Sequence, residues 1–214
     1  MNLSELLKNL RTEEIIGGTD VEITGLSTDS RLTKSGNLFF CYKGCNHDSH
    51  NDIAEAVQKG AAAVICERKL NCNITQIITA KGREQIAPAA RAFYGFADKK
   101  LKIIAVTGTN GKTTTTYMLE SIFKAAGKKT GVIGTLGVSY GDVFISPELT
   151  TPDPIYLHSV FADMVAAGTE YVFMEVSAHA LYFDKINGIR FETGIFTNCT
   201  QDHLDFFKNM RSEE

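Results

Sequence analysis

The stretch that decides the fold is residues 101–116, which reads LKIIAVTGTNGKTTTT. It contains a short apolar run at residues 103–106, of the kind that forms a buried strand. A glycine-rich turn follows this run, and the apolar spacing of residues 117–123 then predicts a helix. Strand, glycine-rich turn, Lys-Thr and helix are the layout of a loop that binds phosphate, because backbone N–H groups and a helix N-terminus both attract anions.

This loop predicts a site for a nucleoside triphosphate. Lys112 is placed to reach the β- and γ-phosphates, and the hydroxyl of Thr113 is placed to ligate Mg²⁺. The general pattern also has a glycine five positions before Gly111, where this chain has Val106, so only the shorter motif Thr-Gly-Thr-Asn-Gly-Lys-Thr-Thr is present. The residues expected to contact the nucleotide are Gly108, Thr109, Asn110, Gly111, Lys112, Thr113 and Thr114.

Composition and charge are those of an ordinary globular protein. The 214 residues are 43% hydrophobic and 22% charged with a formal net charge of −3, which gives no support for a nucleic-acid or membrane-surface protein. No segment has the apolar length of a signal peptide or a membrane span, and the five cysteines are scattered, so we expect a cytoplasmic protein with reduced thiols. Cys41 and Cys45 with His47 are a weak candidate for zinc, since no second close pair of ligands follows.

The chain is predicted to be an α/β protein with two domains, residues 1–98 and 99–214. The first mixes short strands and helices and ends at a polar hinge, residues 98–100. In the second, strands alternate with helices, which predicts a parallel sheet with ligands at the carboxyl ends of its strands. The expected strands are residues 21–26, 37–42, 61–66, 74–79, 103–106, 129–134, 171–176 and 193–197, and the expected helices include a short one capped by Ser4 and residues 53–59, 83–96, 117–123 and 155–167.

The second domain is expected to be truncated. Residues 137–153 are expected to form a loop region, and the chain stops after about four strands of the second sheet with no closing helix. Because a nucleotide-binding α/β domain usually needs more strands than this, we expect part of its sheet to be missing.

Four further stretches follow predicted strands, where a ligand site is expected. Each one alone has an ordinary structural explanation, such as a rigid turn or a solvated carboxylate. Together with the phosphate loop they predict oxygen and nitrogen ligands around a Mg²⁺ that also holds ATP. The stretches are residues 27–31, 150–154, 175–179 and 198–205.

Several of these motifs resemble the Mur ligases, the ATP-dependent amide ligases of peptidoglycan precursor synthesis. The resemblance lies in residues 107–114, in the Glu-Val-Ser-x-His of residues 175–179, and in residues 197–205 with their Asp-His-Leu-Asp. The Thr-Thr-Pro-Asp of residues 150–153 is similar to the member that adds the third amino acid to UDP-N-acetylmuramoyl-L-alanyl-D-glutamate. Residues 28–31 and 36–39 are similar to the uridine-binding N-terminal domain of that member.

The resemblance covers essentially the whole chain and implies an ATP-dependent acid–amino-acid ligase. In such ligases the D-glutamyl carboxylate attacks the γ-phosphate, and a diamino acid, diaminopimelate or lysine, displaces phosphate from the acyl phosphate. The expected partners are these small molecules, and a monomer is expected. The implied catalytic residues are Lys112, Glu175 and His203, the implied Mg²⁺ ligands are Thr113, Glu175 and His203, and the implied substrate-binding residues are Ser30, Thr150, Thr151, Ser177 and Lys185. The resemblance also implies that Asn110 and Asn198 brace the nucleotide loop.

Departures from the family bear on activity. The lysine that is carbamylated in the working enzymes, and the C-terminal domain that binds the incoming amino acid, lie beyond residue 214, so we expect this chain to be inactive alone. Phe183 and Lys185 stand where some members carry Gln and Arg. Lysine keeps the positive charge of arginine but cannot grip a carboxylate through two parallel hydrogen bonds.

Two other functions stay open. The chain could be another Mur-type ligase, or a folylpolyglutamate or cyanophycin synthetase, because these enzymes share the phosphate loop. It could also be a non-catalytic protein that captures a UDP-sugar or a nucleotide. An unrelated P-loop kinase or GTPase is disfavoured, because the base-reading Asn-Lys-x-Asp motif and an apolar run ending in Asp are missing.

Overall fold

The computed structural model describes residues 1–44, 47–146 and 149–200. The chain divides into two compact units, Met1–Gly95 and Phe96–Glu214. Residues 98–100, expected to be a polar hinge, belong instead to a 3-10 helix, Ala97–Lys100 (η4), in which Asp98 is buried.

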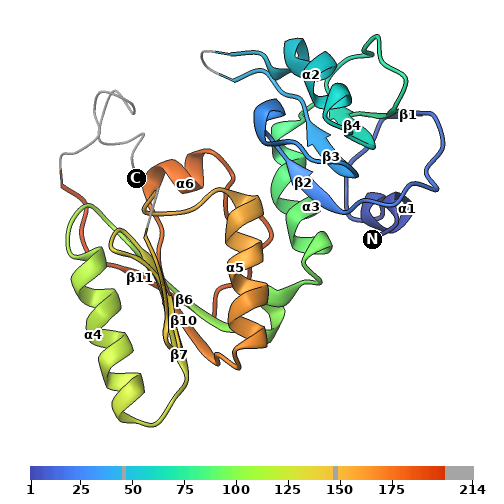
Figure 1. Ribbon diagram of the computed structural model, residues 1–214. Coiled ribbons are helices and arrows are strands. Elements are labelled where there is room, and N and C mark those ends of the chain that lie inside the picture. The colour runs from blue at the N-terminus through green and yellow to red at the C-terminus, as the bar shows by residue number, and fades with distance from the viewer. Residues whose placement is uncertain (45–46, 147–148, 201–214) are drawn as a thin grey trace. The chain divides into compact units, whose positions relative to one another are not determined.

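The first unit is built on a sheet with the strand order β1-β5-β4-β3-β2. Strands β2 to β5 run parallel, and β1 lies antiparallel to β5 at one edge (Figure 1). The strands are Glu14–Ile16 (β1), Gly25–Ser27 (β2), Asn37–Phe40 (β3), Ala63–Cys66 (β4) and Thr75–Ile78 (β5). The helices are Leu3–Leu7 (α1), Ile53–Gln58 (α2) and Ile86–Phe93 (α3), with 3-10 helices at Ser30–Leu32 (η1), Ser49–Asp52 (η2) and Arg83–Gln85 (η3).

The first unit corrects several details of the sequence prediction. The strand expected at residues 21–26 is confined to β2, because the preceding residues pair with the N-terminus, where the Ile23 N–H donates to the carbonyl of Met1. Helix α1 is capped by the side chain of Asn2, which accepts from the N–H of Ser4, rather than by Ser4 itself. The helix expected at residues 83–96 begins as η3 and ends at Phe93, and β1 was not predicted.

The second unit is built on a six-stranded sheet, counted over the described residues, with the order β11-β6-β10-β7-β8-β9. Strands β11, β6, β10 and β7 run parallel, and helix α4 covers one face of the sheet while α5 and α6 lie on the other (Figure 1). The strands are Lys102–Thr107 (β6), Thr130–Gly134 (β7), Gly137–Tyr140 (β8), Val143–Ile145 (β9), Tyr171–Glu175 (β10) and Thr193–Phe196 (β11). The helices are Lys112–Ala125 (α4), Pro154–Ala166 (α5) and Ala178–Tyr182 (α6).

The loop predicted for residues 137–153 is wrong in its first half, which forms the antiparallel strands β8 and β9. Two-residue turns join β7 to β8 and β8 to β9, the first at Thr135-Leu136 and the second at Gly141-Asp142. A Gly-Asp pair between short alternating segments is a recognised hairpin signal. The sheet is therefore mixed, because this hairpin extends the parallel part at its β7 edge.

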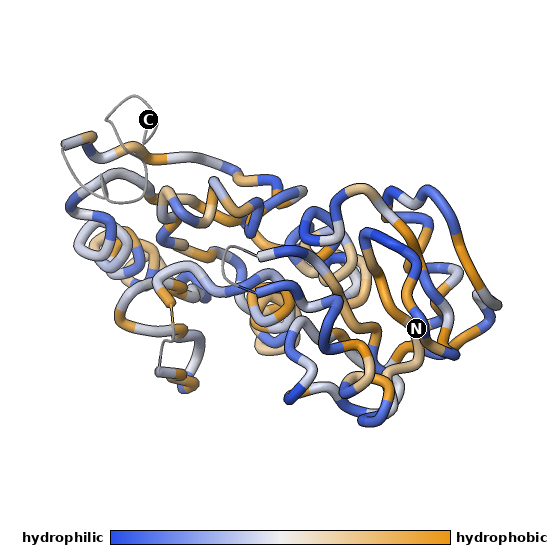
Figure 2. Tube along the Cα trace, turned by 90° about the horizontal axis from the view of Figure 1, so that it is seen from above, coloured by the Kyte–Doolittle hydropathy of each residue, from blue (hydrophilic) through white to orange (hydrophobic). Residues whose placement is uncertain are grey.

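Each unit has its own apolar core. In the second unit the core joins Ile103 and Met174 of the sheet to Leu157 and Phe161 of α5. In the first, Phe39 and Val64 of the sheet pack with Ala56 of α2. Figure 2 shows hydrophobic stretches alternating with hydrophilic connections along the chain. Among the helices that the structure describes, none is long and apolar enough to cross a membrane.

Candidate functional site

The phosphate loop lies between β6 and α4, as predicted. Gly111 has φ 84° and occupies the N-cap position of α4, and Gly108 has φ 125°. A side chain at Gly108 would also meet backbone, since an added Cβ would lie 2.7 Å from the carbonyl oxygen and 2.9 Å from the nitrogen of Asn198. The glycine at position 108 is therefore required both by its backbone conformation and by the chain packed against it.

The segment after β11 holds the loop in place. The side-chain oxygen of Asn198 accepts from the Asn110 N–H at 3.1 Å, and its amide donates to the Asn110 carbonyl at 3.0 Å. The Thr109 N–H donates to the Asn198 carbonyl at 2.9 Å, and the hydroxyl of Thr197 lies 2.7 Å from the Asn110 carbonyl. Thr200 adds its N–H, which donates to the Thr109 hydroxyl at 2.9 Å. The loop thus has a fixed shape that depends on residues about ninety positions further along the chain.

Lys112 begins α4 and keeps its ammonium group over the loop. Its Nζ donates to the carbonyls of Gly108 at 2.6 Å and Thr109 at 3.0 Å. The positive charge therefore lies beside the first turn of α4, where the helix dipole also favours an anion. Lys112 lies on the phosphate loop itself, and its role toward a phosphate group stays a prediction.

Glu175 ends β10, between the phosphate-loop strand β6 and strand β7. Its carboxylate is fully buried and accepts from the Thr113 hydroxyl at 2.9 Å, from the Thr135 N–H at 3.0 Å and from the Thr135 hydroxyl at 3.1 Å. Within the described residues, no Lys, Arg or His side chain forms an ion pair with it. Burial, and then the negative charges of Glu120 and Glu175, raise the pKa of Tyr117 on the facing helix. Among the described residues, the Glu175 carboxylate is therefore held by hydroxyl and backbone N–H donors.

The threonines of the Thr-Thr-Pro-Asp segment lie beside Glu175. The hydroxyl of Thr151 donates to the Glu175 carbonyl at 3.0 Å and accepts from the Ser177 N–H at 3.1 Å. The side chain of Ser177 caps α6 by accepting from the Ala180 N–H at 3.2 Å. The hydroxyl of Thr150 lies 3.1 Å from that of Thr135. The expected nucleotide residues and three of the expected substrate residues thus share one edge of the sheet.

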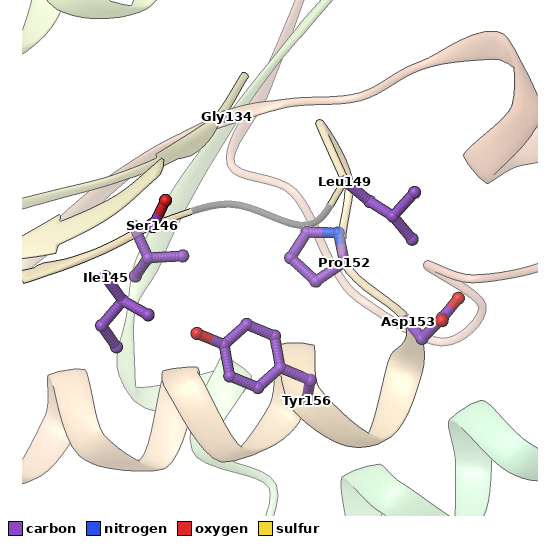
Figure 3. A pocket seen from close by; sticks show the side chains of 8 residues that line it. Gly134, Ile145, Ser146, Leu149, Pro152, Asp153 and Tyr156 are labelled. Carbon is purple, nitrogen blue, oxygen red and sulfur yellow. The ribbon is translucent and has the colours of Figure 1, made fainter. Parts of the chain in front are cut away.

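A pocket of about 330 Å³ opens beside this edge (Figure 3). Its apolar walls include Val138 and Ile145 of the hairpin, with Pro152 and Tyr156 opposite. Asp153, at the start of α5, lines the pocket and forms an ion pair of 2.8 Å with Lys185, whose side chain is only 14% exposed. The charge of Lys185 is therefore already partnered by a carboxylate at the mouth of the pocket.

Ser30 lies in the first unit, in η1. It is buried, and its hydroxyl donates to the carboxylate of Glu55 on α2 at 2.5 Å. This hydrogen bond is the largest cause that lowers the pKa of Glu55, followed by the hydrogen bond from Lys59. Glu55 is therefore ionised at neutral pH and can only accept, so the Ser30 oxygen keeps its lone pairs for a donor.

We predict that Ser30→Ala raises the pKa of Glu55 toward its ordinary value of 4.5. The hydroxyl stabilises the ionised carboxylate, so its removal favours the protonated form. A carbon-13 NMR titration of the Glu55 carboxyl would measure the change, with Ser4→Ala as the control. An unchanged titration midpoint would show that the 2.5 Å contact does not act on Glu55 in solution.

The remaining predicted residues are placed as follows. Thr114 is exposed in the first turn of α4, and Phe183 follows α6, with its ring 6.5 Å from that of His179. His203 and the rest of the Asp-His-Leu-Asp motif lie outside the described residues, and so does Cys45. Among the described residues there is no cluster of three or more His, Cys, Asp or Glu side chains that could hold a metal.

Sequence reasoning missed the roles of Thr135, Thr197 and Thr200, although the last two lie within the stretch 197–205 that it singled out. Thr135 and Thr197 directly follow the parallel strands β7 and β11, so the rule that placed Glu175 at a carboxyl end could have found them. They were missed because a threonine after a strand carries no chemical signal of its own. Their roles become visible only in the folded chain, where Thr135 contacts Glu175 and the other two threonines contact the phosphate loop.

Comparison with known protein families shows to which family this chain belongs. Residues 106–212 match the Mur ligase middle domain, and residues 22–108 match a second model described as the Mur ligase family catalytic domain. The chain belongs to the Mur ligase family. The resemblance inferred from the motifs is confirmed, and so is the α/β fold class with its two sheets.

Individual relatives of this Mur ligase chain agree. It is 44% identical over 216 residues to the UDP-N-acetylmuramoyl-L-alanyl-D-glutamate–2,6-diaminopimelate ligase 1 of Clostridium acetobutylicum, and 43% identical over 215 residues to the corresponding ligase of Bacteroides fragilis. Each alignment covers 99% of this chain and 44% of the relative. The chain therefore spans less than half the length of the curated relatives it matches.

Solved structures give the same picture. A structure of UDP-N-acetylmuramoyl-L-alanyl-D-glutamate–2,6-diaminopimelate ligase superposes with a TM-score of 0.85 at 27% identity, over 100% of this chain and 43% of that one. A structure of UDP-N-acetylmuramoylalanyl-D-glutamyl-2,6-diaminopimelate–D-alanyl-D-alanyl ligase from Acinetobacter baumannii gives a TM-score of 0.65 at 25% identity, over 99% of this chain and 44% of that one. The likeness to the first is stronger in both measures.

Proposed function

We propose that this chain forms the UDP-substrate-binding and ATP-binding parts of a ligase that joins 2,6-diaminopimelate to UDP-N-acetylmuramoyl-L-alanyl-D-glutamate. The observation that carries the reaction class is the buried Glu175 carboxylate bonded to Thr113 beside the Lys112 phosphate loop. The choice of substrate rests on the names of relatives that are 42–44% identical along nearly the whole chain. The first unit is proposed to hold the UDP part, and the second the ATP.

The residues at Glu175 suit Mg²⁺. The Thr113 hydroxyl and the Glu175 carboxylate are hard oxygen donors that are 2.9 Å apart, next to a loop built for phosphate. A buried carboxylate without a cationic partner among the described residues is costly, and a divalent cation would balance its charge. When bound, Mg²⁺ would neutralise charge that develops on the phosphoryl oxygens. His203, the third proposed ligand, lies outside the described residues.

The mechanism follows from what these residues can hold. A carboxylate does not react with an amine at neutral pH, because its oxygen is a poor leaving group. The D-glutamyl carboxylate would therefore attack the γ-phosphorus of ATP and release ADP, and the amine would then displace phosphate from the acyl phosphate. The backbone N–H groups at the start of α4 would position the phosphates, since those of Thr109 and Asn110 are donated to Asn198. Lys112 would offset the phosphate charge as the phosphoryl group moves.

The muramoyl-dipeptide part is proposed to bind near Thr150, Thr151 and Ser177. Their hydroxyls line the sheet edge beside Glu175, so a carboxylate held there would face the γ-phosphate side of the loop. Lys185 is proposed to bind a substrate carboxylate in competition with Asp153, its partner at 2.8 Å. This competition would make its contribution smaller than that of an unpaired cation.

Ser30 is proposed to contact the uridine end. Because its proton is donated to Glu55, its oxygen can accept a hydrogen bond but has no second proton to donate. A uracil ring has an N–H donor, whereas a phosphate at neutral pH offers mainly acceptors. We therefore expect Ser30 to face the uracil ring rather than the diphosphate.

Calorimetric titration tests the proposed function. We expect UDP-N-acetylmuramoyl-L-alanyl-D-glutamate to bind this chain more tightly than UDP, MgATP to bind as well, and Ser30→Ala to weaken the dipeptide nucleotide. The loss of one hydrogen bond predicts a decrease in affinity of about five- to tenfold. Binding of MgATP without any response to the UDP-linked substrate would contradict the substrate assignment and favour another ATP-dependent ligase. No binding of MgATP would contradict the nucleotide site.

A further inference from the structure

Thr135 holds the Glu175 carboxylate by both of its oxygens. The backbone N–H of Thr135 donates to Oε1 at 3.0 Å, and its hydroxyl donates to Oε2 at 3.1 Å. Oε2 is also the oxygen that accepts from Thr113. One residue therefore sets the plane of the carboxylate and the direction in which the Thr113-bound oxygen points.

The hairpin turn gives Thr135 this position. Thr135 and Leu136 form the two-residue connection between β7 and β8, and Gly134 pairs with Gly137 across it. Gly134 has no side chain, and a Cβ added there would lie 2.1 Å from Oε1 of Glu175. The glycine thus lets the carboxylate lie directly against the turn. The β7–β8 hairpin, which sequence reasoning missed, positions both donors.

A second contact joins Thr135 to the substrate segment. The hydroxyls of Thr135 and Thr150 are 3.1 Å apart, and either could be the donor on distance alone. Because the single hydroxyl proton of Thr135 is donated to Oε2 of Glu175, the proton in the Thr150 contact must come from Thr150. The hydrogen bonds therefore run in one direction, from Thr150 to Thr135 to Glu175, and Glu175 also accepts from Thr113 on the phosphate loop.

We propose that Thr135 is a positioning residue that orients Glu175 for the metal–nucleotide complex and links it to the substrate segment at Thr150. This inference rests on the proposed function, because it assumes that Glu175 faces Mg²⁺ bound with ATP. Thr135 itself would touch neither the metal nor the reacting atoms. Its effect would appear in how strongly Mg²⁺ promotes ATP binding, and not in ATP binding without metal.

The test compares Thr135→Val with Thr135→Ser in the 214-residue chain. Valine keeps the shape and the backbone N–H but removes the hydroxyl, and serine restores the hydroxyl. Calorimetry would measure ATP affinity with Mg²⁺ and with EDTA. For Thr135→Val we expect the ratio of the two affinities to fall about tenfold, the loss typical of a hydrogen bond to a charged group, and for Thr135→Ser we expect it to stay near that of the unmodified chain. Thr193→Val, an exposed threonine on β11, is the matched control.

Thr150→Val tests the link to the substrate segment. We expect it to lower the same ratio by a smaller factor, and to add little when combined with Thr135→Val, because both changes break one series of hydrogen bonds.

If the unmodified chain binds ATP with Mg²⁺ dependence and Thr135→Val leaves that dependence intact, the positioning role is wrong while the nucleotide site stands. If the unmodified chain shows no Mg²⁺-dependent ATP binding, the proposed function fails, and this inference fails with it. Equal loss in the Thr135→Ser and Thr135→Val variants would also overturn the inference, because serine keeps the hydroxyl and should then preserve the effect of Mg²⁺.

Discussion

Replacing Gly108 by alanine should weaken MgATP binding by at least about a hundredfold, since backbone strain and overpacking of a few kcal/mol together correspond to two or more powers of ten. Residue 108 has φ 125°, which a residue with a Cβ adopts only at a cost. The added methyl would also lie 2.7 Å and 2.9 Å from backbone atoms of Asn198, which cannot rotate away as a side chain can. The loop would have to separate from the segment after β11, so its N–H groups would no longer converge on a phosphate.

Gly111→Ala is the control for this prediction. Gly111 also has a positive φ, 84°, but an added Cβ would meet no atom within 4 Å. Its cost is therefore backbone strain alone, about 1 kcal/mol, or roughly a fivefold loss of affinity. Calorimetry would give the affinities, and thermal unfolding would show that both variants fold. Equal losses in the two variants would mean that contact with Asn198 does not shape the loop.

The part of the fold around the phosphate loop could be predicted because its signals are local. The apolar run of β6, the glycines and the start of α4 are adjacent in the chain, and each has one ordinary structural meaning. Glu175 and Ser177 could be assigned to the same site because the carboxyl ends of parallel strands meet at one edge. The Thr-Thr-Pro-Asp segment was expected at the same edge by its position in the predicted fold, and the structure brings it beside them. The roles of these residues in binding stay predictions.

The rest of the site depends on partners that are distant in the chain. The hydrogen bonds between Asn198 and Asn110 agree with the bracing role that the family resemblance implied for this pair. Thr200 also holds the loop, through a hydrogen bond that spans about ninety residues, and its residue type gives no sign of such a role. The β8–β9 hairpin was read as a loop because its strands are only three and four residues long, too short for a clear alternation. Missing that hairpin also meant missing Thr135, since the turn that presents it to Glu175 exists only when β8 pairs with β7. The errors in the prediction therefore concern which strands and loops contact one another more than which segments form strands or helices.

Glu175→Gln should remove most of the effect of Mg²⁺ on ATP binding, lowering MgATP affinity by about a hundredfold, as the loss of a metal ligand would. Glutamine has the same size, but it is neutral, and its NH₂ group cannot accept from the hydroxyls of Thr113 or Thr135. The affinity for ATP in EDTA should not fall and should rise slightly, because a buried negative charge near the phosphates is removed. A loss of both affinities would instead indicate that the loop itself had been damaged.

Glu170→Gln is the matched control, because Glu170 directly precedes β10 but is exposed, with only a 3.9 Å contact to Lys128. A surface pair of this kind contributes little, so ATP affinity should change neither with Mg²⁺ nor with EDTA.

Glu175→Gln and Thr135→Val together separate the effect of the Glu175 charge from the effect of its orientation. Glu175→Gln removes the charge that would attract the metal, whereas Thr135→Val keeps the charge and loosens its orientation. If Glu175 acts as proposed, the first change must have the larger effect on MgATP affinity, and neither change must lower ATP affinity when the metal is withheld.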